Sequence, residues 1–182
     1  ELINKASIQI SKIMQKIYKG EVKSIEDLKI KYNINYRAPI KTADLKSEPF
    51  KYDFCVSSTA LEHFTSNDLN EHFNNLKSLI KSNGYISSVI DYSDHYSHTD
   101  KNISPLNFLQ YSDLEWKKYN NLFLYQNRLR HRHYLELFKK FDFFISKEIK
   151  GNSINPPVNL NSKYNNSEKD NFILWGYFLI RN

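Results

Sequence analysis

The densest cluster of titratable residues follows a short apolar segment in the middle of the chain. Asp91, Asp94, His95 and His98 begin where the segment YISSVI (residues 85–90) ends. A carboxylate and an imidazole together can accept a proton from a hydroxyl or an amine, and the same residue types are competent metal ligands. No further metal-ligand motif accompanies the cluster, so we favour proton transfer and expect Asp91 and His95 to carry it. A polar loop with solvated histidines is the alternative.

A second group of polar residues follows another apolar segment, YDFCVSS (residues 52–58). Ser57 and Ser58 end this segment, and Glu62 and His63 come in the next turn. Small polar side chains suit a place where a ligand approaches the backbone, and a neutral imidazole can bind a ligand or accept a proton. We expect His63 to face the site and Glu62 to fix the loop. The alternatives are simple strand termination and a purely structural Glu–His pair.

A basic run lies later in the chain, on a predicted helix. Its members are Arg128, Arg130, His131, Arg132 and His133. A forked guanidinium suits a carboxylate or phosphate group, so we expect Arg128 and Arg130 to bind the substrate. Binding of RNA phosphates and a solvated helix face are the alternatives.

The elements that must position these residues follow the order strand, helix, strand. Residues 52–58 are typical of a buried strand. Thr65 and Asp68 are spaced as the cap of a helix, which Gly84 is expected to end, and residues 85–90 form the next strand. The short connections predict a right-handed crossover and a parallel pair of strands.

Further elements are predicted on either side of this unit. The last two strands are separated by a loop without a helical pattern and should pair antiparallel. Together with the strand–helix–strand unit, they predict the fold class α/β. We expect a single domain over residues 1–182, with a helical lead-in (1–33) and an α/β core (34–182). The flanking elements are an amphipathic helix over 2–18, a short helix capped by Ser24, a strand over 34–40, a helix capped by Ser112, a helix over 127–140, and strands over 143–149 and 172–180.

Composition excludes several classes of protein. The 182 residues carry a net charge of +6 and one cysteine, Cys55, so a domain stapled by internal disulfides is excluded. No apolar run reaches the ~18 residues needed to span a bilayer. These features predict a cytoplasmic protein. The excess of basic over acidic residues permits binding to nucleic acid or anionic lipid. Lysines and acidic residues are interleaved along the chain, however, which favours an ordinary solvated surface.

Several short motifs follow one another over residues 36–182. They are TAD (42–44), PF (49–50) and YD (52–53), then SSTALEHF (57–64), then LKSLIKSNG (76–84), and later IDYSDH (90–95), NFL (107–109) and NRLR (127–130). In this order they resemble the second half of a class I, Rossmann-like S-adenosylmethionine-dependent methyltransferase. The later motifs are similar to a bacterial subgroup with the pattern I-D-x-x-D-H, N-F-L, N-R-L-R.

The resemblance implies a parallel sheet that ends in an antiparallel hairpin, and S-adenosylmethionine as cofactor. It implies that Ala43 and Asp44 bind the adenine, with the Asp44 carboxylate accepting a hydrogen bond from the amino group. Ser57, Ser58 and His63 would lie beside the reacting methyl group. For Asp44, capping of a turn is the alternative.

The chain departs from the family pattern at one important place. The family binds the methionine part of the cofactor on a glycine-rich turn, but this chain has only four glycines and none in a G-x-G arrangement. Because the chain begins at Glu1 rather than Met, we expect a domain that is incomplete at its N-terminus; loss of cofactor binding is the alternative.

We therefore expect a methyltransferase, or its C-terminal part, acting on a small molecule or a saccharide, with no metal, nucleic acid or membrane span. The alternatives are a catalytically inactive, methyltransferase-like interaction module and an RNA methyltransferase.

Overall fold

The structure, a computed structural model, describes residues 15–182 apart from 17, 122 and 165–168. The chain divides into two compact units, Glu1–Ile40 and Lys41–Asn182. Apart from residues 15, 16 and 18, the helix predicted over residues 2–18 lies outside the described residues. The predicted boundary at residue 33 stays a prediction.

In the first unit, helix α2 (Ile25–Tyr32) begins as predicted. The Ser24 side chain caps it by accepting a hydrogen bond from the Asp27 amide at 3.1 Å. The strand predicted over residues 34–40 is wrong, because these residues form no strand. Pro39 has no amide to donate to a neighbouring strand, and no strand among the described residues pairs with this segment.

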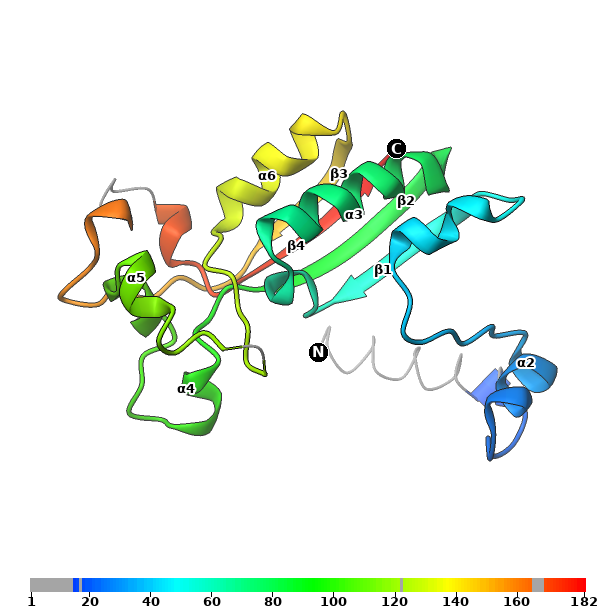
Figure 1. The fold of residues 1–182 in the computed structure, drawn as a ribbon, viewed down its shortest axis with the longest axis horizontal. Coiled ribbons are helices and arrows are strands. Elements are labelled where there is room, and N and C mark those ends of the chain that lie inside the picture. The colour runs from blue at the N-terminus through cyan, green and yellow to red at the C-terminus, as the bar shows by residue number, and fades with distance from the viewer. Residues whose placement is uncertain (1–14, 17, 122, 165–168) are drawn as a thin grey trace. The chain divides into compact units, whose positions relative to one another are not determined.

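The second unit is built on a four-stranded sheet with the order β1-β2-β4-β3 (Figure 1). The strands β1 (Tyr52–Ser58) and β2 (Ile80–Asp91) are parallel. The strands β3 (Phe144–Lys150) and β4 (Trp175–Arg181) form an antiparallel pair, and β4 also runs antiparallel to β2. The α/β fold class, the parallel pair and the C-terminal antiparallel pair are thus confirmed.

Helix α3 (Ser66–Leu79) connects the two parallel strands. Its predicted cap is present, since the Asp68 amide donates to the Thr65 hydroxyl oxygen at 3.1 Å. The prediction that this helix ends at Gly84 is wrong. The helix ends at Leu79, because the chain already pairs with β1 from Ile80 onward. Gly84 lies inside β2, where an added Cβ would approach the Ile80 Cγ2 atom to 2.6 Å, so the glycine permits close packing.

Helix α6 (His131–Lys140) starts later than the predicted residue 127. Together α3 and α6 cover one face of the sheet (Figure 1). The rings of Phe73 on α3 and Phe138 on α6 meet with centroids 5.4 Å apart, and both rings belong to the main apolar core, as does Phe178 of β4. On the opposite face of the sheet, Val56 and Phe144 are exposed.

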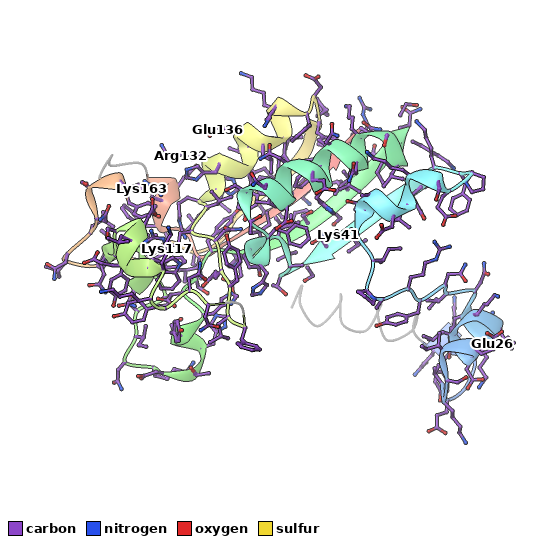
Figure 2. All side chains as sticks on the ribbon, in the orientation of Figure 1. Glu26, Lys41, Lys117, Arg132, Glu136 and Lys163 are labelled. Carbon is purple, nitrogen blue, oxygen red and sulfur yellow. The ribbon has the colours of Figure 1, made fainter. Side chains whose placement is uncertain are left out.

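The segment between β2 and α6 forms a second, smaller core around Phe108, Trp116 and Tyr164. Its helix α5 (Asp113–Trp116) begins with the predicted Ser112 cap. The Lys163 ammonium, labelled in Figure 2, lies 2.9 Å from the Asp113 carboxylate. The remaining short elements are α4 (Tyr96–Thr99) and the 3-10 helices η1 (Thr42–Ser47), η2 (Leu61–His63), η3 (Asn107–Gln110), η4 (Ser162–Tyr164) and η5 (Lys169–Phe172). None of the described helices is both long enough and apolar enough to cross a bilayer.

His72 on α3 gives a prediction for the pH dependence of stability. Burial lowers its pKa from 6.5 to about 4, and its ring packs edge-on against Phe64 and Phe73. Between pH 6.5 and 4, His72 therefore binds a proton in the unfolded chain but not in the folded chain. The free energy of unfolding consequently falls as the pH drops from 6.5 towards 4. The wild type should lose about 1–3 kcal/mol more than His72→Gln over this range in urea unfolding. An equal loss in the two proteins would contradict the burial of a neutral imidazole.

Candidate active site at the sheet edge

The parallel strands β1 and β2 end side by side. Ser58, the last residue of β1, pairs with Val89, and the Thr59 amide donates to the Val89 carbonyl at 2.9 Å. Strand β2 ends two residues later, at Asp91. The polar residues that follow each strand therefore meet at one edge of the sheet, which is the edge where open α/β sheets bind ligands.

The Asp91 carboxylate is the centre of this edge. Its Oδ1 accepts hydrogen bonds from the Ser93 amide at 2.8 Å and the Ser93 hydroxyl at 2.7 Å. Its Oδ2 lies 3.7 Å from His95 Nε2 and 3.5 Å from His98 Nε2. Because the Ser93 hydroxyl donates its proton to Asp91, His98 Nε2 must donate to the hydroxyl oxygen, 3.0 Å away. His95 Nε2, in contrast, has no hydrogen-bond partner in the described part of the chain.

Two histidine rings meet edge-on at the strand ends. His63 from η2 and His95 after β2 have ring centroids 5.0 Å apart. His63 Nδ1 lies 2.8 Å from the Tyr125 carbonyl oxygen, which can only accept, so Nδ1 carries the proton and Nε2 keeps its lone pair. Burial lowers the pKa of His95, opposed by the charge of Asp91, so this ring is neutral near pH 7.

Glu62 lies close to both rings, with one carboxylate oxygen and one nitrogen of each ring all within 4.8 Å of one another. Its side chain is 1% exposed, and neither carboxylate oxygen has a hydrogen-bond partner among the described residues. Burial raises the pKa of Glu62 to about 7; the nearby Asp91 charge also raises it, and the His63 charge lowers it. A buried carboxylate without a donor is costly, which makes it unusual for a purely structural residue.

Two hollows adjoin the cluster. An open cleft of about 450 Å³ is lined by Thr59, Asp91, Ser93 and His98, with Lys101 and Trp175 among its other walls. A smaller hollow of about 140 Å³ lies against His95 and is bounded by Tyr96, Thr99, Trp116, Leu124 and Gln126. The larger cleft has room for a small-molecule substrate next to the carboxylate.

The sheet decides which fold this is. A parallel pair, followed by an antiparallel strand inserted between β2 and the edge strand β3, is the arrangement that the sequence motifs implied. The sheet is consistent with a partial Rossmann-like α/β fold. Three solved structures resemble the chain.

The comparisons cover most of this chain and a smaller share of each match. A methyltransferase from Archaeoglobus fulgidus is 17% identical, with TM-score 0.47, covering 78% of this chain and 64% of that chain. One from Methanosarcina mazei is 12% identical, with TM-score 0.41, covering 75% and 63%. TehB from Haemophilus influenzae is 13% identical, with TM-score 0.44, covering 86% and 44%. The chain thus spans less than two thirds of each of these proteins. No family model and no curated protein matches it.

Two neighbouring residues, Gln126 and Asn127, fix the strand-end loops. The buried Gln126 amide donates to the Ser93 carbonyl, and its oxygen accepts from the His95 amide at 3.2 Å. The Asn127 side chain donates through Nδ2 to the Leu61 carbonyl at 2.9 Å, and the Asn127 backbone N–H donates to the Glu62 carbonyl at 2.7 Å. Sequence analysis missed Gln126; the only signal was its place beside the NRLR motif.

Replacing Gln126 should loosen the His95 loop. In Gln126→Leu the Ser93 carbonyl and the His95 amide lose a buried partner, so we expect the free energy of unfolding to fall by about 1–3 kcal/mol. The exposed Gln15 provides the matched control, and Gln15→Leu should change stability by less than about 0.5 kcal/mol. Equal effects in urea unfolding of the two variants would contradict the bracing role of Gln126.

The two predicted substrate-binding arginines lie in the interior rather than in the cleft. Arg130 is 0% exposed and donates to the Tyr92 and Ile173 carbonyls, both at 2.6 Å. Arg128 donates to the Phe108 carbonyl at 2.8 Å and is also paired with Asp113. Their guanidinium groups already bind the protein's own oxygens, so the expectation that Arg128 and Arg130 contact substrate has no support in this geometry. The basic run does not form a solvated phosphate-binding face either.

The predicted cofactor residues are divided by the fold. Ser57 and Ser58 lie at the end of β1, near His63 and Asp91 at the same edge. Ala43 and Asp44 lie on η1, which packs against α3. The Asp44 carboxylate accepts a hydrogen bond from the Lys41 amide at 2.8 Å, which is the turn cap of the alternative interpretation. No contact among the described residues joins Asp44 to the Asp91 cluster.

Asp94 also differs from its neighbours in the predicted cluster. It is fully buried, and its two oxygens accept from the Tyr96 amide at 3.0 Å and the Asn107 side chain at 3.1 Å. These bonds make Asp94 a support of the loop, whereas Asp91, His95 and His98 border the two hollows.

Proposed function

We propose that this chain carries the acceptor side of an S-adenosylmethionine-dependent methyltransferase that acts on a small molecule or a saccharide. The observation that supports this most is the Asp91–His95 pair at the common end of β1 and β2, next to an open cleft. We also propose one domain over residues 1–182, with residues 1–33 as a helical lead-in, in a cytoplasmic protein.

The chemistry asks little covalent work of the protein. S-adenosylmethionine, when bound, supplies a methyl group on a sulfonium, which is already an activated leaving group. The protein must place a hydroxyl or amine of the acceptor against the Asp91–His95 pair, of which Asp91 lines the larger cleft and His95 the smaller hollow. Positioning of this kind can supply ~7–11 kcal/mol. His95 Nε2 takes the proton that the acceptor loses, and the Asp91 carboxylate, 3.7 Å away, stabilises the imidazolium that results.

The residues present fit the acceptor end of such a site better than the methionine end. Thr59, just after β1, lines the open cleft and adopts a left-handed backbone with φ of 46°. None of the three glycines of the second unit offers an open backbone. An added Cβ would approach Ile80 at Gly84, Trp175 at Gly151, and Tyr92 at Gly176. We therefore derive no contact to the methionine group from this chain.

A methyl-transfer assay tests the proposal. The protein is incubated with S-adenosylmethionine labelled with tritium in the methyl group and with sets of phenolic, amine and saccharide acceptors. We expect label in at least one small-molecule or saccharide set and none in transfer RNA or ribosomal RNA. Labelling of RNA alone, or of no acceptor in any set, would contradict the proposal.

A catalytically inactive interaction module is the second candidate, and one observation favours it. On the sheet face opposite α3 and α6, the apolar side chains of Phe54, Val56, Phe144 and Ile149 are exposed, and such faces commonly bind other proteins. For this candidate, Val56→Lys should abolish binding to a partner while His95→Gln leaves it unchanged. For an enzyme, His95→Gln should abolish methyl transfer.

A further inference from the structure

Three side chains at the strand ends have the composition of a transition-metal site. Glu62, His63 and His95 each offer one ligand atom, and these atoms lie within 4.8 Å of one another. Two imidazole nitrogens and one carboxylate oxygen form the ligand set of many catalytic zinc and iron sites in proteins. For ligand bonds of about 2.1 Å, the ligand atoms of a tetrahedral site are roughly 3.4 Å apart, so modest side-chain rotations would close this set around an ion.

Several buried polar atoms of the cluster lack hydrogen-bond partners among the described residues, and this supports a metal site independently. Glu62 is 1% exposed, and among the described residues neither its two carboxylate oxygens nor His95 Nε2 has a hydrogen-bond partner. Buried polar atoms are nearly always satisfied, so three unpartnered atoms in one place call for a charged or hydrogen-bonding group that the described part of the chain does not supply. A divalent cation would satisfy all of them.

The surroundings provide what a metal site needs besides its ligands. The Tyr125 carbonyl accepts the His63 Nδ1 proton at 2.8 Å, which fixes the ring and directs the Nε2 lone pair away from that carbonyl. Gln126 and Asn127 hold the loops that carry His95 and Glu62. His63 is exposed, so an ion can reach the cluster from solvent.

We propose that Glu62, His63 and His95 bind a divalent transition-metal ion, with Zn²⁺, Co²⁺ or Mn²⁺ as the class of ligand and open coordination positions left for water or a substrate oxygen. Glu62 is buried and its carboxyl oxygens have no hydrogen-bond partner among the residues described, which favours a cation at this place. The His95 lone pair cannot hold a cation and a proton at once, so bound metal and the general-base role exclude each other. The site does not rest on the proposed function, because it is defined by binding alone.

Cobalt binding to the full chain tests the site. After treatment with EDTA and its removal, the protein is titrated with Co²⁺ and the visible absorption of coordinated Co²⁺ is recorded, with calorimetry for stoichiometry. We expect one ion per chain with a dissociation constant in the micromolar range. Glu62→Gln, His63→Gln and His95→Gln should each weaken binding at least tenfold. His98→Gln, which removes a ring stacked 5.0 Å from His95 but outside the set, should change it less than twofold.

The possible outcomes separate the explanations. Glu62→Gln keeps the shape of a protonated glutamic acid, and His63→Gln alters an exposed ring; either variant therefore carries the test if His95→Gln fails to fold. Absence of binding at 1 mM Co²⁺, binding that all three ligand variants retain, or an equal loss in His98→Gln would each overturn the assignment.

Discussion

Replacing Arg130 with methionine is expected to lower the free energy of unfolding by about 3–5 kcal/mol. The guanidinium is fully buried and donates to the Tyr92 carbonyl just after β2 and to the Ile173 carbonyl just before β4. It also lies 5.4 Å over the Tyr92 ring. The variant leaves two buried carbonyls without donors, each costing ~1–3 kcal/mol, together with the ring contact. Urea unfolding at pH 7 measures the loss.

Arg181, the last residue of strand β4, provides the control for this substitution. Arg181 is exposed and its guanidinium lies 5.4 Å over the Phe144 ring on the sheet surface. Arg181→Met should therefore cost less than about 1 kcal/mol. If Arg130→Met were as stable as Arg181→Met, the hydrogen bonds of Arg130 to the segments next to β2 and β4 would not stabilise the fold as we propose. Its predicted role in substrate binding would then deserve a new test.

In the methyl transfer that we propose, replacing His95 with glutamine is expected to lower the rate by about 10²–10⁴-fold, the usual contribution of a general base. The variant keeps a polar side chain of similar size but cannot take the proton of the acceptor. Because burial lowers the pKa of His95 below 6.5, the wild-type kcat should be constant near pH 7 and fall as the pH drops through that lowered pKa. The fall should be absent from the residual rate of the variant.

His72→Gln is the matched control for the pH profile. His72 also has a pKa lowered by burial, but it packs against Phe64 and Phe73, away from the cleft. At pH 7 this variant should keep the wild-type kcat and its acid limb. A His95→Gln variant with more than a tenth of the wild-type rate, or with the same acid limb, would contradict the role of His95 as the base.

Local sequence signals predicted the parts of the fold that depend on nearby residues. The caps at Ser24, Thr65 and Ser112 were correct because each hydroxyl bonds an amide three residues along the chain. The parallel and antiparallel strand pairs followed from connection lengths and helical periodicity. The strand predicted over residues 34–40 failed because a strand needs a partner, and the segment's own pattern of residues does not provide one.

Long-range contacts explain what the sequence could not predict about the site. Arg130 has the composition of a surface residue, and only the packing of Tyr92 and Ile173 around it shows that it is internal. Glu62 was expected to fix its loop, yet its carboxylate has no hydrogen-bond partner among the described residues. Its local sequence resembles that of any loop glutamate, because the burial comes from distant segments. The position of Asp91 and His95 at the end of a strand was predictable because the strand itself is recognisable in the sequence.

The central claim is that methyl transfer takes place at the common end of β1 and β2, beside Ser58 and Thr59. A titration of the ¹⁵N-labelled protein with S-adenosylhomocysteine, followed by NMR, tests it most directly. The account predicts weak, saturable shifts, with a dissociation constant between about 0.1 and 5 mM, at the amides of Ser58, Thr59 and His63. Absence of shifts at 10 mM ligand, or shifts confined to the first unit around α2, would contradict it.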